Sequence, residues 1–240
     1  MEVVIILIIL GIIGYLIYQS LPSTKFEKAQ AHFNAKNYVE AISVLDGIFD
    51  KHNDAPAKFA ECKLILGQGL KAYSEKLKAF NEILELRKRI NNTSSIAKFE
   101  NIEAKALFEI AKIQYEKSKA DIDKLNQNLK FIDNANKKGL ETDFNTLRTK
   151  HFNQLSESYF IKAIGHEKSN KYTDAIQIYK KAIECSEKSS ISTTKHNAVV
   201  RISICRLKLN EVLTCTKIQK FKSLIRNIKK IYFTGIQFIS

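Results

Sequence analysis

Apolar residues recur at every third or fourth position from Ser23 onward, rather than at every second position. This spacing predicts helices that each bury one face, and the few glycines and prolines fall mostly between the periodic stretches. Pro56, for example, follows Asp54-Ala55 as a helix start. We expect an all-α fold with five antiparallel helix pairs. The expected helices span 24–35, 38–52, 56–73, 75–90, 95–118, 121–137, 142–168, 172–187, 193–209 and 211–231.

The N-terminal segment is different, because residues 3–18 contain no charged residue. As a helix it would span roughly 24 Å, close to the hydrocarbon core of a bilayer, with Tyr15 and Tyr18 at one interface. A cleaved signal peptide is a less consistent alternative, because the segment starts with Met-Glu rather than a positive charge and Tyr18-Gln19-Ser20 is a poor cleavage site. A buried core helix is a third alternative. Lysines follow the segment, so we expect a single-pass anchor over residues 1–22 and a cytoplasmic C-terminal region.

Two stretches, 156–189 and 25–54, share a pattern of small and aromatic residues that repeats after 134 residues. The first contains Tyr159, Ala163, Tyr172, Ala175, Tyr179 and Ala182, and the second contains Ala29, Tyr38, Ala41 and Leu45. His32 and His166 then fall at the same position of the two repeats. The pattern resembles the tetratricopeptide repeat, a 34-residue helix–turn–helix unit. The match is partial at 66–83 and weak elsewhere, and it implies a right-handed α-solenoid over residues 23–209.

The resemblance implies a protein-binding groove lined by the first helix of each pair. The residues that it places there are Phe26, Gln30, Phe33, Asn34, Gln68, Lys71, Phe160, Ile164 and Glu167. Such a groove would accept an apolar or extended peptide. The alternative is that the aromatic residues pack between neighbouring helices. The lysine and asparagine clamp with which one subclass holds a terminal carboxylate is absent, since Phe26 and Gln30 occupy its first two positions.

Basic residues are concentrated at the end of a chain whose net charge is +14. We expect residues 210–240 to form a basic amphipathic helix followed by an apolar tail. Its candidate contacts to lipid or another polyanion are Lys217, Lys220, Lys222, Arg226, Lys229 and Lys230. Three interpretations remain open: a helix that caps the solenoid, a helix on an anionic membrane surface, and a nucleic-acid contact.

Motifs for catalysis, metal or cofactor binding are lacking. The four cysteines are dispersed, and Gly67-Gln68-Gly69 lies in a helical pattern without the strand that a dinucleotide site requires. We therefore expect no enzyme activity, no cofactor and no metal. The predicted function is a membrane-anchored scaffold or adaptor that binds partner proteins. The alternatives are a basic protein that binds nucleic acid or another polyanion at the membrane, and a ligand-responsive membrane effector.

Overall fold

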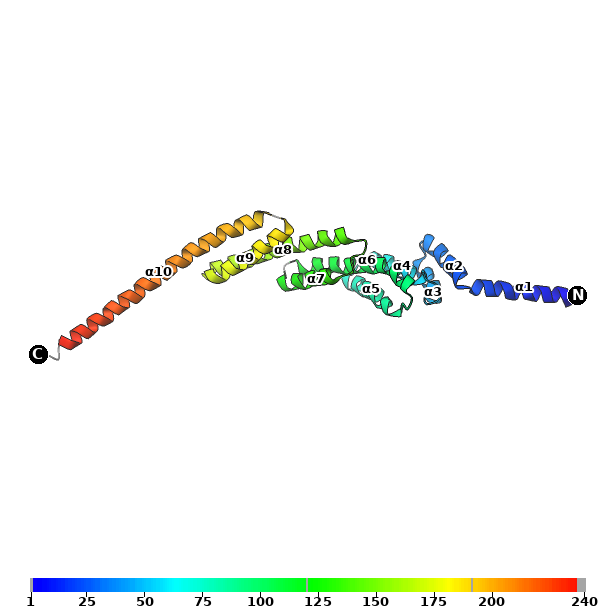
Figure 1. The fold of residues 1–240 in the computed structure, drawn as a ribbon, viewed down its shortest axis with the longest axis horizontal. Coiled ribbons are helices and arrows are strands. Elements are labelled where there is room, and N and C mark those ends of the chain that lie inside the picture. The colour runs from blue at the N-terminus through cyan, green and yellow to red at the C-terminus, as the bar shows by residue number, and fades with distance from the viewer. Residues whose placement is uncertain (1, 120, 191, 237–240) are drawn as a thin grey trace. The chain divides into compact units, whose positions relative to one another are not determined.

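The computed structural model describes the backbone of residues 2–119, 121–190 and 192–236, with side chains at positions 7, 9–119, 121–190, 193–220, 222, 223 and 226. Regular structure in these ranges is entirely helical, which confirms the all-α prediction and is compatible with a helical repeat (Figure 1). The α-helices are α1 (Glu2–Ser20), α2 (Pro22–Asn34), α3 (Tyr38–Asp46), α4 (Ala55–Gly69), α5 (Tyr73–Leu86), α6 (Thr93–Ser118), α7 (Ile122–Asn134), α8 (Glu141–Lys168), α9 (Tyr172–Ser189) and α10 (Ser192–Ile236). A short 3-10 turn, η1 (Arg87–Arg89), follows α5.

Helix α1 forms where the sequence predicts a membrane anchor over residues 1–22. Its described apolar side chains are exposed along its length, from Leu7 to Tyr18. Within the described part of the chain, however, no helix is both long and apolar enough to cross a membrane.

Eight of the ten helices expected after the anchor are present as separate helices. Helix α3 ends at Asp46, earlier than expected, because Gly47 follows it and the Ile48 N–H turns back to the Leu45 carbonyl at 3.1 Å. The two helices expected at 193–209 and 211–231 were wrong, since α10 continues through Asn210 without a break. No glycine or proline stands there to interrupt it. The expectation of five helix pairs is therefore corrected to four pairs and one long final helix.

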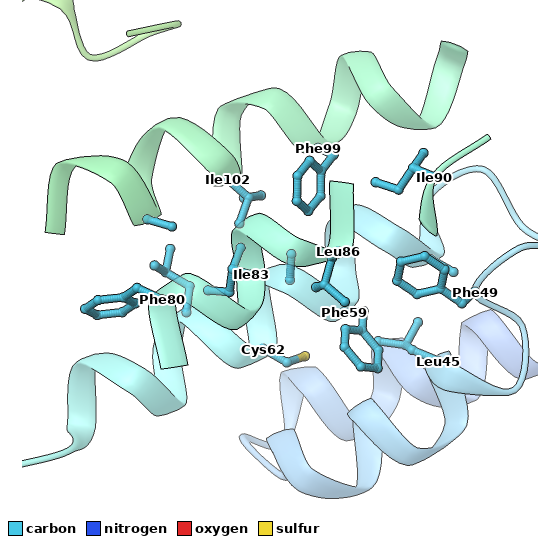
Figure 2. Packing of buried hydrophobic residues seen from close by; sticks show 14 of the residues in the cluster. Leu45, Phe49, Phe59, Cys62, Phe80, Ile83, Leu86, Ile90, Phe99 and Ile102 are labelled. Carbon is cyan, nitrogen blue, oxygen red and sulfur yellow. The ribbon is translucent and has the colours of Figure 1, made fainter. Parts of the chain in front are cut away.

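The chain forms two compact units. The first contains the residues up to Ser118 together with Asn126–Leu147, and the second contains Lys119–Leu125 together with the residues from Arg148 onward. Helices α2 to α6 pack consecutively in the first unit, and α4 also packs against α6. Their shared core includes Phe80, Ile83 and Phe99, all fully buried (Figure 2).

Gly67 allows α4 and α5 to approach closely. A Cβ atom at this position would lie 2.9 Å from Cε1 of Phe80 and 3.2 Å from Cβ of Ala79, both on α5. Gly67 is buried in the last turns of α4 and serves helix packing, whereas Gly69 is exposed and meets nothing within 4 Å.

The hairpins α2–α3 and α8–α9 have the same turn. Lys36 and Asn170 adopt left-handed backbone conformations, with φ of 62° and 57°. In each turn the next N–H donates to a histidine carbonyl five positions earlier, that of His32 or His166, at 2.9 Å. This shared turn confirms that the two histidines occupy equivalent positions in two repeated hairpins.

Small residues meet at the helix crossing of both hairpins. Ala29 and Ala41 are fully buried in the first hairpin, and Ala163 and Ala175 are fully buried in the second. Alanine at these positions lets two helices pack at short distance, with larger side chains filling the space beyond the crossing. The 134-residue periodicity of the sequence therefore corresponds to a repeated packing arrangement.

Candidate protein-binding groove

A groove of about 500 Å³ in the first unit is lined mainly by α2, α4 and α6, the first helices of the first three hairpins. Its lining residues are Phe26, Gln30, Asp54, Ala57, Lys58, Glu61, Lys98, Asn101, Ile102 and Lys105. Two of the predicted groove residues, Phe26 and Gln30, are thus brought together with side chains that the sequence did not single out.

The floor of the groove is apolar. Phe26 is half-buried, and its ring stacks on the ring of His52 with centroids 4.1 Å apart and an interplanar angle of 10°. Ile102 from α6 is 8% exposed. This floor offers a small apolar surface against which an aliphatic or aromatic side chain can pack.

The rim of the groove is polar, and most of its charges are paired. Lys58 Nζ lies 2.7 Å from Glu61 Oε2, and Lys98 forms an ion pair with Asp54 across the α4–α6 contact. Lys105 is exposed and has no ion-pair partner among the described residues. Lys105 is therefore the rim cation that is available to a negatively charged ligand group.

Two exposed amides, Gln30 and Asn101, complete the rim. Each amide can donate and accept hydrogen bonds, so the pair can bind the main chain of an extended peptide. Neither residue type carries out acid–base or nucleophilic chemistry at neutral pH. The two amides are therefore suited to hydrogen-bonding a ligand.

The other predicted groove residues of the first unit lie outside this cavity. Phe33 packs edge-on against Tyr38, with ring centroids 5.4 Å apart, and Lys58 Nζ covers its ring at 4.1 Å. Gln68 donates to Glu109 Oε1 at 3.4 Å and so links α4 to α6. Asn34 is the last residue of α2, and Lys71 follows α4; both are exposed.

The three predicted groove residues of the second unit, Phe160, Ile164 and Glu167, pack against α9 and α10. The centroids of the Phe160 and Tyr179 rings are 5.5 Å apart. Ile164 is half-buried in the same cluster. Phe160 therefore packs between neighbouring helices, as the alternative to a groove position predicts, and Ile164 packs in the same cluster.

Glu167 is 8% exposed and connects three helices. It accepts hydrogen bonds from Tyr179 Oη at 2.9 Å and from Arg201 Nη1 at 3.2 Å. Burial and the hydrogen bond to Glu167 raise the pKa of Tyr179. Burial and then the charge of Glu167 raise the pKa of Cys205. This cluster holds the first half of α10 against α8 and α9, and nothing in the sequence spacing indicated that Arg201 would reach Glu167.

The predicted basic contacts on α10 are exposed wherever the structure describes them. Lys217, Lys220, Lys222 and Arg226 are all exposed on this helix. The side chains of Lys229 and Lys230 lie outside the described residues.

An apolar pocket of about 300 Å³, which the sequence did not indicate, lies between α3, α4 and α5. Val39, Leu66 and Leu70 line the pocket and are themselves exposed. Lys63 and Glu82 also line it, and they form an ion pair in which Nζ and Oε2 are 2.9 Å apart. Sequence periodicity shows which residues of a helix are apolar but not which helix faces remain uncovered.

Metal-binding clusters of three or more His, Cys, Asp or Glu side chains do not occur in the described part of the chain. No protein-family model matches the sequence, and no curated protein resembles it closely enough to count as a relative.

Proposed function

We propose that this chain is a non-catalytic adaptor that binds a partner protein through the groove formed by α2, α4 and α6. The observation that supports the proposal is the combination of an apolar floor, two exposed amides and one uncompensated cation in that groove. The repeated hairpins support a relationship in architecture to tetratricopeptide-repeat proteins, whose first helices line a peptide-binding groove.

The groove chemistry defines the partner segment that we propose. An apolar side chain packs on Phe26 and Ile102, the peptide main chain bonds to Gln30 and Asn101, and an acidic side chain reaches Lys105. Binding in an extended conformation leaves the peptide groups accessible to the two amides.

A peptide-display selection on the full chain tests this function. Selected peptides are expected to pair an acidic residue with a nearby apolar residue. Exchanging Lys105→Glu replaces attraction by repulsion and should weaken their binding by about tenfold, or ~1.4 kcal/mol. The matched control is Lys130→Glu, which changes the same charge at an exposed site on α7. Selection of no consensus, or equal binding by both variants, would contradict the proposal.

We further propose that α1 holds the protein at a membrane, with the helices that follow it on the cytoplasmic side. Its described apolar side chains from Leu7 to Tyr18 are between 46% and 63% exposed, and α1 contacts α2 where the two helices meet. Burying this surface in lipid would remove it from water.

Membrane fractionation tests the role of α1. The full chain should stay with membranes through a high-salt wash, and a chain lacking residues 2–20 should be released by that wash. Resistance to alkaline carbonate indicates an embedded α1, whereas release indicates attachment to the surface. Recovery of the full chain in the soluble fraction contradicts the proposal.

A further inference from the structure

Helix α10 has two parts with different surroundings. Ala198, Ile202 and Cys205 are buried against α9 and α8. From Arg206 to Arg226 every described side chain is exposed except Leu209, which is half-buried. We call residues 206–226 the α10 arm. One aromatic contact is described there, with Lys208 Nζ 5.7 Å from the centroid of the Tyr172 ring.

The α10 arm carries a positive charge that its own residues do not balance. Six of its residues are basic and one is acidic. The basic residues are Arg206, Lys208, Lys217, Lys220, Lys222 and Arg226, and the acid is Glu211. None of the described ion pairs involves them, although lysine-rich exposed helices are commonly stabilised by acids one turn away. An anionic surface would supply the missing counter-charge.

The arm also exposes large apolar side chains, which electrostatic binding alone does not use. Leu207 is 65% exposed, Val212 52%, Leu213 51% and Ile218 49%. The arm contains a single aromatic residue, Phe221, whereas binding of single-stranded nucleic acid uses several aromatic side chains on which successive bases stack. An anionic bilayer accommodates both kinds of side chain, because its headgroups attract the cations and its acyl chains bury the aliphatic groups.

Other occupants fit the arm less well. A second copy of the arm would bring two strongly positive helices together, and like charges oppose that association. A bilayer would also cover α1, whose exposed apolar side chains are a separate uncovered surface of the same chain. One partner thus accounts for both.

We propose that the α10 arm docks on the surface of a membrane containing anionic lipids. This goes beyond peptide binding in the groove, and it does not depend on α1, whose uncharged apolar residues do not distinguish anionic from neutral lipid. Charge-dependent vesicle binding is the property that belongs to the arm.

The test compares binding of the full chain to phosphatidylcholine vesicles with and without phosphatidylserine, at physiological salt. The unaltered chain should prefer the anionic vesicles. Changing Lys217, Lys220, Lys222 and Arg226 to Gln removes four charges. Each basic residue that contacts an anionic surface increases affinity about fivefold. If two of these four residues contact the surface, the preference for anionic over neutral vesicles should fall by at least about 25-fold.

The matched control changes Lys28, Lys51, Lys130 and Lys180 to Gln, which alters net charge equally at exposed positions elsewhere. This control should keep the preference within about threefold. A triple variant, Val212→Ser, Leu213→Ser and Ile218→Ser, should weaken anionic-vesicle binding while keeping all charges. Equal binding of the unaltered chain to both vesicles overturns the proposal. So does a preference that survives the four-Gln change, or tighter binding to RNA that the triple variant leaves unchanged.

Discussion

Replacing Gly67 with alanine should destabilise the first unit, because the added Cβ has no room. It would lie 2.9 Å from Cε1 and 3.3 Å from Cδ1 of Phe80. Carbon atoms in contact normally stay about 3.5–4.0 Å apart. The Phe80 ring is 0% exposed, so neighbouring core residues oppose its displacement (Figure 2).

The expected size follows from two opposing effects. Forcing an extra carbon into a packed core costs about 1–3 kcal/mol, while exchanging glycine for alanine within a helix gains about 0.5–1 kcal/mol. The net loss of stability should be about 1 kcal/mol, within a range of about 0–2.5 kcal/mol. Gly69→Ala is the matched control two residues later on α4, since its Cβ would meet nothing within 4 Å.

Urea titration followed by circular dichroism measures the change, and amide exchange of α4 and α5 assigns it to the first unit. Shortening the contacting side chain with Phe80→Leu should reduce the cost of Gly67→Ala by about 1 kcal/mol in a double-mutant cycle. If Gly67→Ala is as stable as Gly69→Ala, or more stable, the proposed close approach of α4 and α5 is wrong.

Three further predictions concern the buried polar and thiol groups. Glu167→Ala should lower the stability of the second unit by about 2 kcal/mol, because the buried Tyr179 hydroxyl loses its acceptor, whereas Glu167→Gln should lower it less. Amide exchange of α9 and early α10 measures both losses, and equal losses would contradict the role of Glu167 as acceptor. At pH 8 iodoacetamide should modify the exposed Cys215 while leaving the buried Cys62 and Cys205 unmodified, and labelling of all three at equal rates would refute their burial. Burial raises the pKa of Cys62 from 9.0 to about 11, so its protonated form stabilises the first unit fully below pH 9 and this contribution is lost as pH rises toward 11. Between pH 9 and pH 11 the urea midpoint of the first unit should therefore fall less in Cys62→Ala than in the unaltered chain. The same dependence of the midpoint on pH in both proteins would contradict a raised pKa of Cys62.

Helical periodicity was sufficient to predict most of the fold. The predicted repeat also placed Ala29, Ala41, Ala163 and Ala175 at helix crossings, because small residues are needed wherever two helices approach closely. The continuity of α10 was missed, although neither a glycine nor a proline stands near Asn210 to end the helix.

The candidate site was less predictable, because exposure depends on which helices neighbour one another. Phe26 and Phe160 occupy similar sequence positions, yet Phe26 lines a groove and Phe160 packs against Tyr179. Lys105 and Asn101 lie in a stretch that departs from the repeat pattern, and only the packing of α6 beside α4 brings them to the groove. Tertiary contacts of this kind leave no local periodic signal.

Site-specific photo-crosslinking tests the adaptor function most directly. A photoreactive amino acid at Asn101 lies on the rim of the groove, and one at Ser74 lies on α5, away from it. A partner protein should crosslink through Asn101, Lys105→Glu should reduce the yield of this product about tenfold, and Ser74 should give no product. Crosslinking of the same partner through Ser74 alone, or through Asn101 regardless of Lys105→Glu, would contradict recognition in this groove.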